Sequence, residues 1–144
     1  MLIVVTIVAL VAGLSFPSVA TGLDSLRLRS ASDSIVAFLN TALARAERRQ
    51  QAVEIRISPQ DNSMTARSAD MGFVRRLDIP DAIRIVSVSP ALPGNADDQP
   101  RRFLLYPGGA VPRIGIEIEN KERRRRQVSV DPVTGVPRSE LESQ

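Results

Sequence analysis

The sequence predicts an α+β fold in which one long N-terminal helix precedes an antiparallel β domain. Three observations support this prediction. Residues 1–23 contain no charged side chain, residues 24–51 carry apolar side chains at steps of three and four, and apolar residues alternate with polar ones beyond residue 51. The 144 residues are a usual length for one domain, so we expect the helix and the sheet to share a single core.

The first element is the uncharged segment 1–23. A membrane span needs roughly 20 apolar residues, and a lone segment in lipid has to satisfy its own backbone hydrogen bonds, which only a helix does. We therefore expect a helical transmembrane half over residues 1–23, with a kink or a locally melted turn near Gly13 to Pro17 because proline removes a backbone hydrogen bond. A cleaved secretory signal peptide is the alternative. Ser18-Val19-Ala20 fits a cleavage site, but no basic residue precedes the apolar run.

The second element is an amphipathic continuation of the same helix over residues 24–51. No Pro or Gly interrupts this segment, and its apolar side chains recur on one stripe while arginines and aspartates lie elsewhere. The stripe predicts a helix face that packs on the β domain. The side chains expected to be buried on the sheet are Ile35, Phe38, Leu39 and Leu43.

The remainder predicts an antiparallel β domain over residues 52–138, followed by a flexible tail over residues 139–144. Short runs with a period of two are separated by turn residues, which is typical of antiparallel sheet. Residues 90–100 are rich in turn residues and predict a loop, and residues 132–135 predict a turn. The strands are expected at residues 53–57, 64–67, 73–79, 83–88, 102–106, 114–118 and 127–131.

The composition argues against catalysis. The chain contains no Cys, no His and no Trp. A disulfide framework and a thiolate nucleophile are therefore excluded, and the commonest general base and the usual zinc ligands are missing. Asp97 and Asp98 lie close together, but their spacing matches no calcium-binding loop. We therefore expect no catalytic residue, no cofactor, no metal site and no small-molecule substrate.

The densest charge cluster is KERRRR, at residues 121–126. One interpretation is a hairpin tip and strand start that lie in solvent. The other is a site for phosphate, on DNA or on anionic lipid headgroups, because the planar guanidinium group binds phosphate through two hydrogen bonds. No aromatic residue interrupts the cluster, so stacking with bases is not expected.

Three segments resemble the type IV pilin superfamily. Residues 2–19 (LIVVTIVALVAGLSFPSV) look like the pilin N-terminal segment, in which a small residue and a proline close an apolar run. Residues 29–58 and 125–138 are similar to the helix–strand junction and to the last strand and turn of H-type minor pseudopilins and of the related FimT pilins. The resemblance implies a pilin-like fold whose N-terminal helix makes the filament and membrane contacts. The implied contact residues are Leu2, Ile3, Val4, Val5, Ile7, Leu10, Gly13, Leu14, Phe16 and Pro17.

The same resemblance implies a function in assembly. It indicates a minor pseudopilin of a type II secretion system, which is held in the inner membrane with its C-terminal domain in the periplasm and assembles into a pseudopilus that supports protein export. The implied partners are other pseudopilins or pilins, the inner membrane and secreted cargo proteins.

Two other functions stay open. One is a minor type IV pilin that binds DNA for uptake. FimT-like pilins that bind DNA are expected to carry a Gly-Arg-x-Arg turn, where this chain has Gly135-Val136-Pro137-Arg138. The other is a secreted β domain that is released by signal cleavage. The residues that the first of these assigns to DNA contact are Arg123, Arg124, Arg125, Arg126 and Arg138.

The N-terminus departs from the family pattern. The family begins with a basic leader, a processing site and a glutamate, and at family spacing from Pro17 that glutamate would immediately precede Met1. We therefore expect that the protein starts upstream and that Met1 is an internal methionine. A basic leader would also outweigh Arg27 and Arg29, which by the positive-inside rule favour a cytoplasmic domain.

Overall fold

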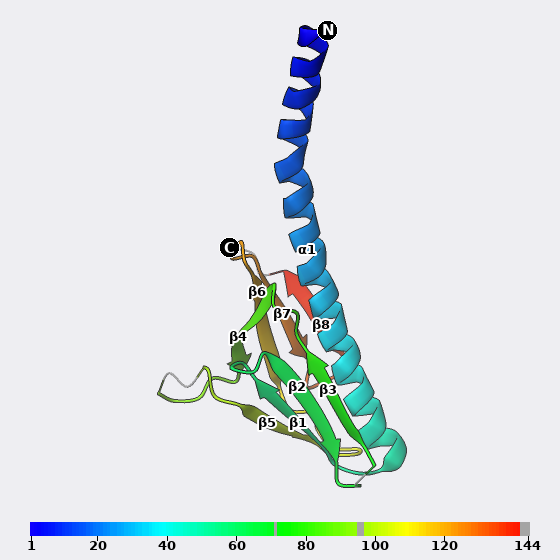
Figure 1. Ribbon diagram of the computed structural model, residues 1–144. Coiled ribbons are helices and arrows are strands. Elements are labelled where there is room, and N and C mark those ends of the chain that lie inside the picture. Colours follow the sequence, from blue (N-terminus) through cyan, green and yellow to red (C-terminus); the bar gives the residue numbers. More distant parts are fainter. Residues whose placement is uncertain (71, 95–96, 142–144) are drawn as a thin grey trace.

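The computed structural model describes residues 1–144 except residues 71, 95–96 and 142–144, and it describes residues 15–21 without their side chains. One helix, α1 (Leu2–Arg49), extends beyond a β domain at its N-terminal end and packs on that domain along its second half (Figure 1). The strands form two four-stranded sheets in which all pairings are antiparallel. The predicted α+β fold is therefore confirmed.

The helix ends where the chain turns into the first strand. Gln50 adopts the left-handed conformation with φ of 52°, and its backbone N–H bonds to the carbonyl oxygen of Ala46. Arg48 and Arg49 occupy the last turn, where positive charge complements the negative end of the helix dipole. The kink or melted turn expected near Gly13 to Pro17 falls largely on residues 15–21, whose side chains lie outside the described part of the chain.

The strands belong to two sheets. The first has the order β3-β2-β1-β5 and the second the order β4-β6-β7-β8. All seven expected strands are present, with ends that differ from the predicted ones by a few residues. The strands are β1 (Val53–Ser58), β2 (Ser63–Ser68), β3 (Val74–Asp78), β4 (Ile83–Ser89), β5 (Arg101–Leu105), β6 (Ile114–Asn120), β7 (Arg125–Val130) and β8 (Pro137–Leu141).

Strand β8 corrects the predicted flexible tail. Residues 139–141 pair with β7 in the register Leu141 to Arg126 and Ser139 to Val128, so the tail predicted for residues 139–144 is wrong over these three residues. The sequence PRSEL contains one large apolar residue and shows no alternation of apolar and polar side chains. Hydrogen bonding to β7 imposes the strand conformation, and the local sequence pattern does not indicate this pairing.

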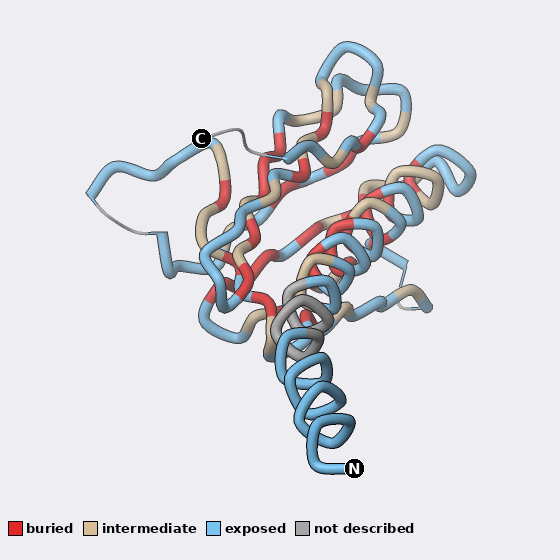
Figure 2. The backbone as a smooth tube through the Cα atoms, turned by 90° about the horizontal axis from the view of Figure 1, so that it is seen from above, coloured by how far each residue is buried: buried red, intermediate tan, exposed pale blue. Residues whose placement is uncertain are grey.

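The core lies between the two sheets and the second half of α1 (Figure 2). On the helix, Ile35, Phe38 and Leu39 are buried, and Leu43 is half-buried against the same cluster. Ser32 is also fully buried, which the apolar stripe alone does not indicate. The sheet side of the core consists mainly of β-branched residues. Its fully buried members include Val53, Ile55, Ile57, Ile83, Ile114, Ile116, Ile118 and Val128.

A bulge in β4 explains an irregular burial pattern. The register with β6 shifts between Ile85 and Ser87, so that Val88 and not Ser87 returns to the buried face. The hydroxyl of Ser87, on the other face, donates to a carboxylate oxygen of Glu117 at 2.8 Å.

One asparagine links the two sheets. Asn62, in the turn between β1 and β2, donates its side-chain amide to the carbonyl oxygens of Ile83 at 2.7 Å and Ile79 at 3.3 Å. Its Oδ1 accepts the backbone N–H of Ile85 at 3.0 Å. The turn of one sheet is thereby joined to the first strand of the other.

Candidate functional site

The exposed end of α1 is the first candidate. Leu2, Ile3 and Val4 are 85%, 75% and 61% exposed, and this part of the helix extends away from the β domain (Figure 1). A continuous apolar surface of this kind marks a contact with another protein or with a membrane. Val5, Ile7, Leu10 and Leu14 are exposed as well. Gly13 is also exposed, with open space where a Cβ atom would stand.

Two residues of the predicted contact set, Phe16 and Pro17, lie outside the residues whose side chains are described. Within the described residues, no helix combines the length and the apolar character that a membrane crossing requires.

The arginine cluster begins in the tight turn between β6 and β7. Asn120 forms this turn: its Oδ1 accepts the backbone N–H of Glu122 at 3.1 Å and of Arg124 at 2.9 Å. Arg123 follows in the left-handed region with φ of 64°, and its side chain is exposed. The Arg124 guanidinium lies 3.5 Å from the Glu122 carboxylate. Two guanidinium groups therefore lie at the tip in solvent.

The next two arginines are held by the fold. Arg125 donates to Glu117 and to Glu119, both at 2.8 Å, and these hydrogen bonds raise the pKa of its guanidinium group. Arg126 is half-buried and lies 3.3 Å from the hydroxyl oxygens of both Ser32 and Ser139. It thus links β7 to the helix and to β8. The cluster is free in solvent only in part, because its second half contacts other residues of the domain.

Arg138 is not brought to this tip. It is exposed on β8 opposite Ser129, whereas the β8 residue opposite Arg126 is Leu141. Three strand residues therefore separate Arg138 from the level of Arg126, which is about 10 Å along the strand. Residues 131–136 form the connecting turn, in which Gly135 has φ of 67°. There the backbone N–H of Val133 donates to Asp131 and lowers the pKa of that carboxyl group.

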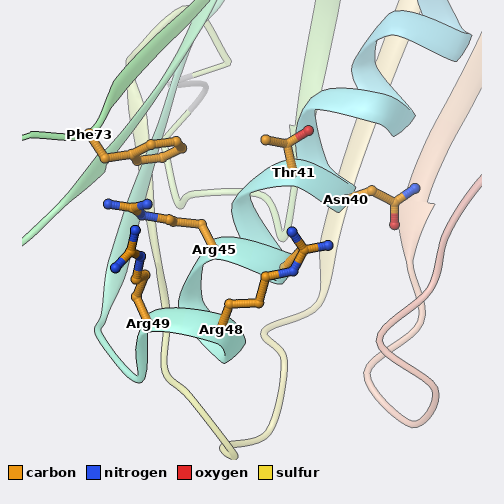
Figure 3. Close-up of a pocket in the computed structure, with 7 residues that line it drawn as sticks. Asn40, Thr41, Arg45, Arg48, Arg49 and Phe73 are labelled. Carbon is orange, nitrogen blue, oxygen red and sulfur yellow. The ribbon is translucent and has the colours of Figure 1, made fainter.

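A hollow of about 460 Å³ lies beside the last turns of α1 (Figure 3). The Arg45 guanidinium carbon is 4.9 Å from the centroid of the Phe73 ring, a distance suited to a cation–π contact. Arg49 lies next to Arg45, while Arg48 points away from Phe73. The Arg45 Nε is buried and has no hydrogen-bond partner among the described residues.

A second basic surface was not predicted from the sequence. Arg56, Arg67, Arg76 and Arg102 come from four different strands and line one hollow of about 540 Å³ on the outer face of the β3-β2-β1-β5 sheet. The sequence indicated part of this surface, because the period of two places Arg56 on the face of β1 that is opposite to the face of the buried Ile55 and Ile57. The sequence could not show which strands lie side by side.

Within the described residues, no three His, Cys, Asp or Glu side chains are grouped so as to hold a metal ion. The described residues present two kinds of contact surface, which are the apolar end of α1 and basic patches on the β domain.

Comparisons with known proteins identify the fold. No family model and no curated protein matches the chain. A solved structure of the minor pseudopilin EpsH from the type 2 secretion system of Vibrio cholerae superposes with a TM-score of 0.63 at 11% identity, covering 82% of this chain and 99% of that one. The type IV minor pilin FimU of Pseudomonas aeruginosa superposes with a TM-score of 0.56 at 16% identity, covering 81% of this chain and 88% of that one. The expected pilin-like fold is confirmed.

Proposed function

We propose that this chain, which has the fold of minor pseudopilins and minor type IV pilins, is a minor filament subunit that works by assembly and not by catalysis. The observation that supports this function best is the row of exposed apolar side chains at the free end of α1. Fully burying a side chain such as Leu2 or Ile3 contributes about 1.5–3 kcal/mol. Packing this end of the helix against neighbouring helices, or in lipid, recovers that free energy.

The finer form of the proposal is a pseudopilin of a type II secretion system. Residues 1–23 hold the subunit in the inner membrane, with the β domain in the periplasm, until it is extracted into the pseudopilus. There α1 packs against the helices of other pseudopilins, and the β domain contacts the neighbouring subunits or the secreted cargo. The minor pseudopilin EpsH supports this form, because 99% of its solved chain is matched.

Site-specific photocrosslinking tests the assembly. A benzophenone amino acid at Val5, which is 66% exposed on the free end of α1, should give adducts with other pilin-like subunits in cells that assemble the filament. The control position is Val133, which is 90% exposed in the turn before β8. Adducts from Val133 alone, or identical Val5 adducts in cells without the assembly machinery, would contradict the proposal.

A minor type IV pilin that binds DNA is the second candidate function. The observation in its favour is the pair Arg123 and Arg124, which lie in solvent at the hairpin tip and can be replaced without removing a contact to the core.

This candidate function predicts a change in salt dependence. The affinity for duplex DNA falls as salt rises, and each lost phosphate contact should make the slope of log affinity against log salt shallower by roughly 0.9. Replacing Arg123 and Arg124 with Gln should therefore give a shallower slope and leave the melting temperature unchanged. Arg29→Gln with Arg48→Gln, two exposed arginines on α1, is the matched control because it removes the same net charge. Absence of duplex binding by the unaltered protein at about 50 mM salt, where electrostatic binding is strong, would eliminate this candidate.

A further inference from the structure

We propose that the outer face of the β3-β2-β1-β5 sheet is a docking surface for an acidic segment of a partner protein, bound by Arg56, Arg67 and Arg102. These three arginines form the sheet-face cluster. The docking surface goes beyond the proposed function, which names no surface of the β domain, and it does not involve the free end of α1. Four arginines and one glutamate line its hollow, so positive charge dominates there.

The strand register places the arginines in rows. Arg56 on β1 is directly opposite Arg102 on β5, and on the other side of β1 the same row continues through Thr65 to Arg76. The neighbouring row contains Arg67 opposite Glu54. Because adjacent strands are about 4.8 Å apart, the row from Arg76 to Arg102 spans about 14 Å.

Like charges directly opposite each other weaken a sheet. Arg76 is neutralised by Asp78, whose carboxylate lies 2.7 Å from its Nε. In contrast, Arg56 and Arg102 form no side-chain hydrogen bond or ion pair with any described residue, and both are exposed. The fold gains nothing from this pairing, whereas an incoming carboxylate would relieve the repulsion and accept two hydrogen bonds from a guanidinium group.

The surroundings of the arginines favour a polypeptide over a nucleic acid. Glu54 lies within the hollow and would repel a continuous phosphate backbone, while a protein segment can place a neutral residue there. The row of Arg67 ends on Val74 and Leu104, which are 60% and 46% exposed and offer apolar contacts. No aromatic side chain lines the hollow for stacking on bases. About four or five extended residues would cross the 14 Å row.

The test uses the full chain in a neutral detergent and a labelled peptide of about eight residues in which Glu alternates with Ser, a spacing that places every carboxylate on one side of an extended chain. Binding is measured by fluorescence anisotropy at about 20 mM and about 150 mM salt, because exposed charge contacts are screened at the higher concentration. Duplex DNA is measured in parallel. The variant is Arg56→Gln with Arg102→Gln, and the matched control is Arg123→Gln with Arg124→Gln, which removes the same net charge.

We expect the sheet-face variant to bind the peptide at least about five-fold more weakly and the control less than about two-fold more weakly at low salt. The melting temperature of the sheet-face variant should be unchanged or higher, because a repulsive pair is removed. Equal losses in the two variants would show attraction by net charge alone and overturn the proposal. So would the absence of peptide binding at low salt. DNA binding that is lost only in the sheet-face variant, without peptide binding, would assign the surface to nucleic acid and overturn it too.

Discussion

Removing residues 1–23 should convert the protein from a membrane-associated form into a soluble monomer. The reason is that the large apolar side chains described in this segment are exposed, so their removal takes away apolar surface without removing support from the core. After carbonate washing, the full chain should stay with membranes, and the chain that begins at Asp24 should stay in solution. Size-exclusion chromatography should show the shortened chain as one monomeric species.

The shortened chain should also retain its fold. Its core residues on α1 begin at Leu28, which is 2% exposed, and the buried stripe continues from there. The melting temperature of the β domain is therefore expected to be nearly unchanged. A full chain that remains soluble without detergent after the wash would contradict the proposed anchor. A shortened chain that fails to fold would show instead that the free end of the helix supports the domain.

Phe38→Ala should destabilise the domain by about 3–5 kcal/mol, because it removes a large side chain from a packed core and leaves a cavity. Phe38 is 7% exposed on the face of α1 that packs on the sheets. A domain of this size has a total stability of about 5–15 kcal/mol, so the loss is a large fraction of it. The free energy of unfolding should be measured by urea denaturation on the chain that begins at Asp24.

Leu26→Ala is the matched control for this experiment. Leu26 lies on the same helix but is 61% exposed, and exposed positions away from special features usually change stability by less than about 0.5 kcal/mol. Equal free energies of unfolding for the Phe38 variant and the unaltered protein would mean that this face of α1 is not part of the stabilising core. A large loss of unfolding free energy in the Leu26 variant would show that the face of α1 that carries Leu26 stabilises the domain, and would contradict the packing described here.

The arginine cluster shows how far residue type and spacing predict a surface. Its sequence predicted either a solvated tip or a phosphate site. The structure separates the four arginines, because two of them form the turn that Asn120 organises, and the other two enter β7. The contact of Arg126 with Ser32 joins residues 94 positions apart in the chain. No local pattern contains that information.

The sequence by itself determined the elements that depend on local periodicity. The helix could be predicted because steps of three and four place Ile35 and Leu39 on one face, and β6 because Ile114, Ile116 and Ile118 alternate with smaller or charged residues. Both patterns arise within a few residues, from backbone geometry and the burial of one face.

Only the tertiary structure decided which strands are neighbours. The pairing of β1 with β5 places Arg56 opposite Arg102, across a long stretch of intervening chain, and thereby creates the sheet-face cluster. Likewise, PRSEL becomes a strand only because β7 offers it an edge. Strand order and register follow from the joint packing of two sheets on one helix, and this depends on contacts between residues that are distant in the sequence.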